Sequence, residues 1–332
     1  MTDNESTSGD DYGLLIVTPV FNDWECLNLL LPRLDSVMSG YSHVSSTTVL
    51  VVDDASNEPA DINFDVDAAQ SIQSLKILRH HRNLGHQRAI GIGLTFALEH
   101  IPCDVVVVMD ADGEDTPEDV PKLLDEVRRT DGAKIVFAER MRRSESLLFI
   151  LFYHLYRFAH LVLTGISVRV GNFSAIPSRY LSNFSVISET WSHYAAAIFA
   201  TSLPRTSVPI ARGKRLAGNP KMNFTALVTH GLAALSVHGA IIGIRMLVSA
   251  SALSVLSILT SVIMLILWLI GGYTDLQIFA VGGLYASFIL LSVTIFIFGL
   301  NLLILNNRTL LGYLPGRDYN YFIERVYDHD ES

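Results

Sequence analysis

Short apolar runs alternate with amphipathic segments along residues 1–145. Five of these runs have the length and the β-branched content that are typical of buried strands. They cover residues 13–23, 47–56, 74–80, 103–108 and 133–140. Helical patterns follow the first, third and fourth runs. The order of elements therefore predicts an α/β domain with a mainly parallel, Rossmann-like sheet covered by helices on both faces.

Two long segments without charged residues lie in the second half of the chain. Residues 246–274 and 276–307 contain no Asp, Glu, Lys or Arg. As helices that rise ~1.5 Å per residue, both are longer than the ~30 Å core of a bilayer, which predicts two transmembrane helices. A buried helical hairpin is the alternative, but soluble helices of this length usually carry a polar stripe.

Two further apolar segments are predicted to lie at the membrane surface. Residues 222–244 place their apolar side chains on one helical stripe, which is typical of an interfacial amphipathic helix. Residues 147–165 are interrupted by His154, Arg157 and His160, and they suit a helix against the membrane better than a third span.

These patterns divide the chain into five parts. Residues 1–12 are a disordered N-terminus, 13–221 the α/β domain, 222–244 the interfacial helix, 245–307 the two spans, and 308–332 a C-terminal tail. The polar N-terminus lacks the features of a signal peptide, and Lys and Arg flank the pair of spans but are absent from the turn between them. The positive-inside rule then predicts a multi-pass cell-membrane protein with the α/β domain and both termini in the cytoplasm.

Charge and cysteine content narrow the class of partner. The formal net charge of -9 disfavours nucleic acid as a partner. Cys26 and Cys103 are too few and too far apart for a metal knuckle, and they fit a reducing compartment. A homo-oligomer is left open by the sequence.

Polar residues end three of the predicted strands, at the edge where parallel α/β sheets bind ligands. They are Pro19, Asn22 and Asp23 after the first strand, Asp53, Asp54 and Ser56 after the second, and Asp110, Asp112 and Glu114 after the fourth. So many carboxylates repel each other unless a cation lies among them, and Mg²⁺ or Mn²⁺ bound to a diphosphate meets that need. A turn or a helix cap is the alternative for a single Asp-x-Asp pair.

A set of short motifs occurs in a defined order between residues 14 and 224. They are VTPVFND, VVDDAS, RNLGHQRAIGIGL, MDADGEDTPEDVPKLL, ERMRRSES, GNFSAIPSRYL and RLAGNPKMNF. Together they resemble the family-two glycosyltransferases with a GT-A fold, and within that family the polyprenyl-phosphate and dolichyl-phosphate sugar transferases. Each motif alone is weakly specific, and the order and spacing of the set carry the resemblance.

The resemblance implies roles for individual residues. It assigns the nucleotide sugar to Pro19, Asn22, Asp23, Asp53, Asp54 and Asp110. It assigns catalysis to Asp110, Asp112, Arg142 and Arg143, and the acceptor phosphate to Arg140, Arg215 and Lys221. Within these sets Asp53 would contact the base, Asp110 the ribose and diphosphate, and Asp112 the metal. A solvated basic loop or positive-inside charge is the alternative for the basic residues.

The histidines and glycines after the third strand receive a structural interpretation. His80, His81 and His86 have no metal-ligand spacing and are expected to be polar loop residues. Gly85, Gly91 and Gly93 are expected to serve tight turns and close packing, not a phosphate-binding fingerprint.

One position departs from the family pattern. Asn172 stands where the family usually has the Asp of a Gly-Asp-Phe segment. An acceptor hydroxyl needs a base near its operating pH. A phosphate monoester, with a second pKa of ~6, is already largely dianionic at pH 7, so Asn172 suits a lipid-phosphate acceptor better than a sugar hydroxyl.

The resemblance therefore implies a membrane-anchored, metal-dependent and inverting glycosyltransferase of cell-envelope glycan synthesis. It would move a sugar from a nucleotide diphosphate sugar to an undecaprenyl or dolichyl phosphate at the cytoplasmic face. A transferase with a saccharide or other hydroxyl acceptor, and a non-catalytic membrane protein with this fold, are the alternatives. A processive synthase is disfavoured because the chain has no Gln-x-x-Arg-Trp motif.

Overall fold

The computed structural model describes residues 12–140, 160–165, 170–218, 224–271, 275–309 and 312–329. The chain divides into two compact units. The first unit combines residues 1–146, 168–237 and 313–332, and the second combines residues 147–167 and 238–312.

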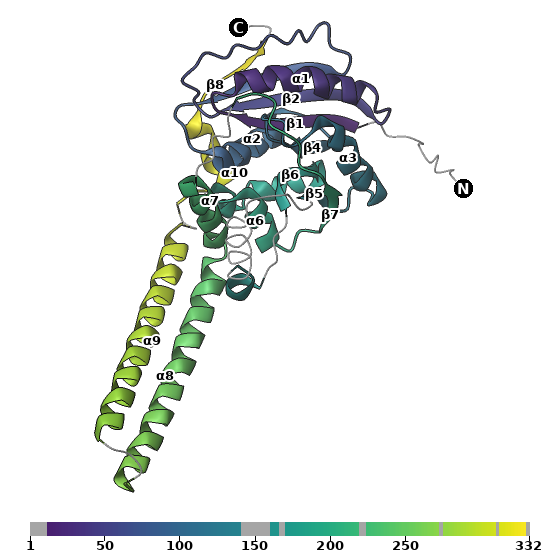
Figure 1. The fold of residues 1–332 in the computed structure, drawn as a ribbon. Coiled ribbons are helices and arrows are strands. Elements are labelled where there is room, and N and C mark those ends of the chain that lie inside the picture. Colours follow the sequence, from purple (N-terminus) through teal and green to yellow (C-terminus); the bar gives the residue numbers. More distant parts are fainter. Residues whose placement is uncertain are drawn as a thin grey trace. The chain divides into compact units, whose positions relative to one another are not determined.

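Within the described residues, eight strands of the first unit form one sheet in the order β7-β5-β6-β4-β1-β2-β3-β8 (Figure 1). The strands are β1 (Tyr12–Val20), β2 (Val44–Asp53), β3 (Ile72–His80), β4 (Val105–Val108), β5 (Ile135–Arg140), β6 (Val170–Pro177), β7 (Arg205–Ile210) and β8 (Ile323–Asp328). The strands β1 to β4 are parallel, and so is the pair β5 and β7, whereas β6 and β8 run antiparallel to their neighbours. The predicted mainly parallel sheet is confirmed, while the sequence pattern did not indicate β6, β7 and β8.

Helices cover both faces of this sheet, as the sequence predicts (Figure 1). The helices α1 (Trp24–Ser39) and α3 (Val120–Arg129) contribute to the apolar cluster on one face. The opposite cluster includes side chains of α2 (His86–His100), α5 (Leu181–Phe184) and α6 (Tyr194–Ala200). Short 3₁₀ helices occupy Pro117–Asp119, Ser178–Tyr180, Ser188–Trp191 and Tyr319–Phe322.

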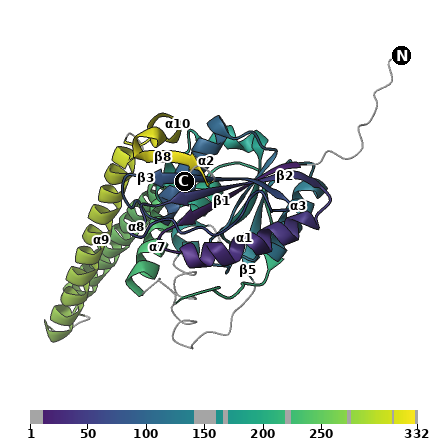
Figure 2. The same ribbon diagram turned by 90° about the horizontal axis from the view of Figure 1, so that it is seen from above.

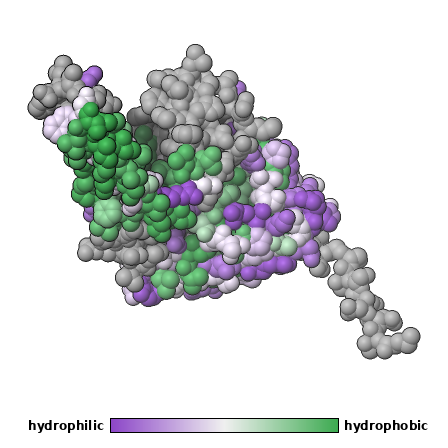
Figure 3. Space-filling model, turned by 90° about the horizontal axis from the view of Figure 1, so that it is seen from below, coloured by the Kyte–Doolittle hydropathy of each residue, from purple (hydrophilic) through white to green (hydrophobic). Residues whose placement is uncertain are grey.

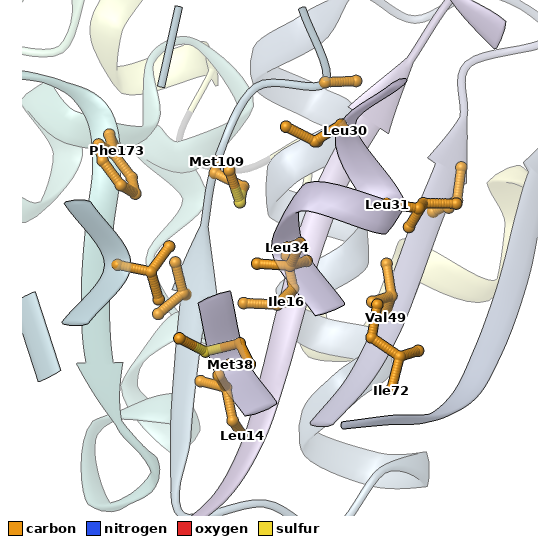
Figure 4. Close-up of a cluster of buried hydrophobic side chains, with 14 of the residues drawn as sticks. Leu14, Ile16, Leu30, Leu31, Leu34, Met38, Val49, Ile72, Met109 and Phe173 are labelled. Atoms are coloured by element: carbon orange, nitrogen blue, oxygen red, sulfur yellow. The ribbon is translucent and has the colours of Figure 1, made fainter. Parts of the chain in front are cut away.

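The leucine spacing of α1 explains how it packs. Leu30, Leu31 and Leu34 share one side of the helix and lie against Ile16 of β1 and Val49 of β2 (Figure 4). All five side chains are at most 1% exposed. Burying each of them contributes about 1.5–3 kcal/mol, so this face holds α1 firmly against the strands whose ends carry the acidic residues.

The strand register brings the predicted polar ends together. Val20 of β1 pairs with Asp53 of β2, and Val17 of β1 pairs with Val108 of β4. On the opposite face α2 approaches the sheet closely, since a Cβ on Gly93 would lie 2.8 Å from Val52 Cγ2. The carboxyl ends of β1, β2 and β4 therefore lie side by side at one edge of the sheet.

The C-terminal segment of the chain belongs to the first unit. The strand β8 lies antiparallel beside β3 (Figure 2), and α10 (Pro315–Asp318) precedes it. Tyr319 is fully buried, and its hydroxyl donates a 2.6 Å hydrogen bond to Glu99 of α2. Residues 308–332 are only a tail in the sequence-based division, whereas the structure makes 313–329 an integral part of the α/β unit.

The helix α7 (Phe224–Ser236) also belongs to the first unit. It ends at Ser236, and the next helix begins at Gly239, so the predicted helix 222–244 is divided between two elements. The side chains of Val228 and Leu232, one helical turn apart on α7, are 44% and 60% exposed.

The second unit contains the two long helices α8 (Gly239–Leu269) and α9 (Asp275–Thr309). They pack closely, since a Cβ on Gly299 of α9 would lie 3.1 Å from the Gly243 carbonyl oxygen of α8. Large apolar side chains are exposed along both helices (Figure 3). In the part of the chain that the structure describes, Gly239–Leu269 and Val281–Leu302 are long and apolar enough to cross a membrane.

Candidate active site

The turn after β4 presents the acidic residues of the fourth predicted strand. Gly113, at φ 84°, allows the chain to reverse between Asp112 and Glu114. The backbone N–H of Asp110 donates to the Asp115 carboxylate at 3.0 Å, and that of Glu114 donates to Asp112 Oδ1 at 2.9 Å. Asp115 thus shapes the turn, while the side chains of Asp110 and Asp112 keep 27% and 23% of their surface exposed.

A loop after β7, residues 211–218, lies directly on this turn. The N–H of Gly213 donates to the Glu114 carbonyl at 2.8 Å, and the N–H of Leu216 donates to the Asp112 carbonyl at 2.9 Å. A Cβ on Gly213 would lie 2.5 Å from the Gly113 carbonyl oxygen, so only glycine permits this approach. The two backbone segments therefore hold each other in place.

Two arginines of this loop reach the acidic residues. Arg215 contacts Asp112 Oδ2 at 3.2 Å and Asp23 Oδ1 at 2.5 Å, which joins the ends of β1 and β4. Arg212 forms an ion pair with Glu114, and burial lowers the pKa of its guanidinium. These cations supply the positive charge that the cluster of carboxylates requires. The structure places Arg215 among the predicted metal and nucleotide residues, although the resemblance assigned it to the acceptor phosphate.

His86, the first residue of α2, completes the cluster. Its Nε2 lies 3.1 Å from Asp110 Oδ1 and 3.0 Å from Asn172 Nδ2 on β6. Burial alone would lower the pKa of His86, but the charge of Asp110 outweighs it and the pKa is raised. His86 therefore belongs to the candidate site, and it is the first residue of α2, not a loop residue as the sequence suggested.

The carboxylates at the end of β2 bind protein groups. Asp53 is fully buried, with Arg79 Nη1 2.6 Å from its Oδ2. Asp54 is 4% exposed and accepts hydrogen bonds from the N–H groups of Leu84 and Gly85. His80 was expected to lie in a loop, but it is a buried residue of β3, with its Nδ1 3.0 Å from Asp54 Oδ1. In this structure Asp53 and Asp54 shape the loops around the site.

The polar side chain of Asn22, after the end of β1, also binds protein groups. Asn22, at φ 53°, accepts hydrogen bonds from the N–H groups of Asn57 and Glu58 through its side-chain oxygen. Pro19 is buried within β1. Arg142, Arg143 and Lys221 lie outside the described residues, as does the side chain of Arg140 at the end of β5.

The donor set fits a divalent cation that a diphosphate helps to bind. Mg²⁺ and Mn²⁺ prefer carboxylate oxygens, and Mg²⁺ typically takes one or two of them together with phosphate oxygens and water. Burial and the nearby charge of Asp110 raise the pKa of Asp112, and a cation would offset both effects. The described residues contain no cluster of three His, Cys, Asp or Glu side chains that could hold a metal alone. Asp112, with Asp110 beside it, would therefore hold the ion only together with ligand oxygens.

Comparison with known proteins gives the same fold and family. The model of the family described as "Glycosyl transferase family 2" matches residues 15–184. The Micrococcus luteus undecaprenyl-phosphate mannosyltransferase is 37% identical over 118 residues, which cover 36% of this chain and 45% of that protein. The Salmonella choleraesuis undecaprenyl-phosphate 4-deoxy-4-formamido-L-arabinose transferase is 30% identical over 134 residues, which cover 40% and 38%. The chain thus spans less than half of the length of these two relatives.

A solved structure supports the fold. Glucosyl-3-phosphoglycerate synthase from Mycobacterium tuberculosis, in complex with Mn²⁺, UDP-glucose and phosphoglyceric acid, aligns with a TM-score of 0.50 and 15% identity. The alignment covers 70% of this chain and 80% of that chain. Since the family model covers half of the chain and the sheet has the GT-A arrangement, the chain belongs to glycosyl transferase family 2.

Proposed function

We propose that this protein is a membrane-anchored, metal-dependent glycosyltransferase that moves a sugar from a nucleotide diphosphate sugar to a polyprenyl phosphate at the cytoplasmic face. The observation that carries the proposal is the edge of the sheet at which Arg215 joins Asp23 to Asp112, with Asp110 paired to His86 beside them. Such an edge binds phosphorylated ligands in α/β folds, and family membership supports a nucleotide sugar as the ligand.

The chain's own residues would carry most of the electrostatic work of the transfer. Asp112, with Asp110, would hold Mg²⁺ or Mn²⁺, and the ion supplies positive charge to the leaving diphosphate. Arg215 contacts Asp112, Arg212 pairs with the nearby Glu114, and both would turn to the diphosphate when it binds. Fixed positive groups at a developing negative charge are commonly the largest catalytic term. Arg140, Arg142, Arg143 and Lys221 are proposed as further phosphate contacts.

Two observations support a lipid phosphate as the acceptor. Both curated relatives are named for undecaprenyl phosphate although their sugars differ, so the acceptor is what their names share. Asn172 lies 3.0 Å from His86 at the site and carries no carboxylate that could deprotonate a hydroxyl. A phosphate acceptor needs no such base, because its second pKa of ~6 leaves it largely dianionic at pH 7.

The division into units supports the proposed membrane topology. Residues 168–237 and 313–332 are parts of the same compact unit, so the chain leaves that unit at α8 and returns to it after α9. Two spans between segments of one unit place both segments on the same side of the membrane. The basic residues that flank the pair of helices support the cytoplasm as that side. The exposed apolar residues Val228 and Leu232 of α7 fit a helix at the bilayer surface.

The test uses the purified full-length chain in detergent with Mn²⁺, undecaprenyl phosphate and a panel of nucleotide sugars, read by the mass of the lipid product. We expect one donor to give a glycosylated lipid phosphate, and chelation by EDTA to abolish the product. Asp112→Asn should lower turnover at least about 100-fold, because it removes the negative charge that holds the cation. Asp67→Asn, on an exposed loop, is the matched control.

Two results would contradict the proposal. Transfer to a saccharide hydroxyl with no lipid product would show that polyprenyl phosphate is not the acceptor. Unchanged turnover of Asp112→Asn, or full activity in EDTA, would remove the metal from the reaction.

A further inference from the structure

The start of β6 places Asn172 directly opposite the acidic turn. The antiparallel ladder between β4 and β6 pairs Val105 with Pro177 and Val108 with Ser174. Continuing this register by two residues brings Asp110 opposite Asn172. The contacts of His86 agree, because its Nε2 lies 3.1 Å from Asp110 Oδ1 and 3.0 Å from Asn172 Nδ2.

The amide of Asn172 is buried but incompletely bonded. Asn172 is 9% exposed, and its Oδ1 has no hydrogen-bond partner among the residues that the structure describes. A buried polar atom without a partner costs about 1–3 kcal/mol, so such an atom at a site indicates that a ligand supplies the missing bond. His86 occupies the other end of the amide and thereby fixes its position.

The chemistry of the missing partner follows from the amide group. Rotation by 180° exchanges the amide oxygen and nitrogen, so the end that faces away from His86 accepts in one orientation and donates in the other. A hydroxyl can both donate and accept, and it therefore satisfies Asn172 in either orientation. A phosphate oxygen in its dianionic form only accepts, and it satisfies only one of them.

We infer that Asn172, positioned by His86, hydrogen-bonds a hydroxyl of the sugar that is transferred and so helps to select the donor. The inference rests on the proposed function, in which the diphosphate lies at Asp110 and Asp112. The sugar is joined to that diphosphate and is therefore within reach of the neighbouring Asn172. The ribose of the nucleotide is the other source of hydroxyls, and the experiment separates the two.

The test compares two ligands of the same nucleotide on the full-length protein in detergent with Mn²⁺. A panel of UDP-glucose, UDP-galactose, UDP-N-acetylglucosamine and GDP-mannose first identifies the donor, and calorimetry then measures the affinity of that donor and of its free nucleoside diphosphate. We expect Asn172→Ala to weaken the nucleotide sugar about 10-fold, the loss of about 1.4 kcal/mol, and to leave the nucleoside diphosphate within about twofold. Unchanged binding of the nucleoside diphosphate also shows that the variant is folded.

A deoxy-sugar analogue of the donor tests whether Asn172 contacts a sugar hydroxyl directly. The analogue that lacks the contacted hydroxyl should bind the parent protein and Asn172→Ala equally, whereas a purely structural role of Asn172 would weaken every analogue alike. Asn183→Ala on α5 is the matched asparagine control, and it should change neither affinity.

Three other results would each overturn the inference. Equal weakening of nucleotide sugar and nucleoside diphosphate would place the hydroxyl on the ribose and overturn the inference, as would no weakening of either ligand. In both cases transfer by the parent protein would leave the proposed function intact. If no nucleotide sugar binds the parent protein, the proposed function fails and this inference fails with it.

Discussion

Removing the Tyr319 side chain should destabilise the α/β unit strongly, because this residue anchors the C-terminal segment after the two long helices. Tyr319 is 0% exposed, and its hydroxyl donates to Glu99 at 2.6 Å and lies 3.0 Å from His100. Burial and the neighbouring Glu99 raise the pKa of Tyr319 to about 12, so the hydroxyl keeps its proton at neutral pH.

The magnitude follows from the two parts of the side chain. Tyr319→Ala creates a cavity and should cost about 3–5 kcal/mol, as large aromatic deletions in cores do. Tyr319→Phe removes only the hydroxyl and should cost about 1–2 kcal/mol, since Glu99 loses a hydrogen bond to its charged group. At about 2–4 °C per kcal/mol for a unit of this size, Tyr319→Ala should lower Tm by at least about 6 °C.

The assay is thermal unfolding of the full-length protein in detergent, followed by circular dichroism and by limited proteolysis of the C-terminal segment. Tyr321→Ala is the matched control, because Tyr321 lies in the same segment but is 79% exposed. An unchanged Tm for Tyr319→Ala would show that the segment does not dock on α2. That result would also remove the structural support for placing both flanks of α8 and α9 on one side of a membrane.

Three further predictions concern the site and the core around it. Arg215→Ala should lower turnover about 10- to 100-fold, because it removes a cation from the diphosphate. The same change should reduce the Mn²⁺ concentration for half-maximal activity, because Asp112 loses a competing partner. A higher Mn²⁺ requirement would contradict this. Gly213→Val should abolish transfer, because its Cβ would lie 2.5 Å from the Gly113 carbonyl oxygen. Gly40→Ala is the control, since its Cβ would meet nothing nearer than 3.5 Å. Full activity of Gly213→Val would show that the loop 211–218 does not lie on the turn after β4. Asp35→Asn should cost about 1–3 kcal/mol at pH 7, since the carboxylate accepts the N–H groups of residues 70–72. Burial alone would raise the pKa of Asp35, but the three hydrogen bonds outweigh burial and the pKa is lowered. The stabilisation is therefore present above the unfolded pKa of about 3.9 and is lost as the pH falls through the folded pKa. The difference in Tm between parent and variant should therefore shrink towards pH 3, and a constant difference would argue against the charged acceptor.

The sequence alone determined which elements form and which strand ends carry chemistry. The apolar runs of β1 to β5 and the leucine spacing of α1 are local patterns, and burial of their apolar faces leaves one arrangement, a covered parallel sheet. The same reasoning located the acidic ends of β1, β2 and β4, because parallel strands share one edge. The two long segments without charged residues, 246–274 and 276–307, were evident from composition.

Only the tertiary structure decided how those residues are used. Arg215 and Asp112 are far apart in the sequence, and their contact depends on the close approach of two backbone segments at Gly213. Asp53 and Asp54 follow a strand just as Asp110 does, yet the loops around β2 bury them with Arg79 and with the N–H groups of residues 84–85. No local pattern distinguishes these two kinds of carboxylate.

The C-terminal strand shows the same limit most clearly. The segment 323–328 is short and only half apolar, because an edge strand with an exposed face needs little apolar character. Their place beside β3 is determined by pairing with a strand more than 200 residues earlier and by the burial of Tyr319. Sequence periodicity records which face of an element is buried, whereas the partner that buries it is a property of the folded chain.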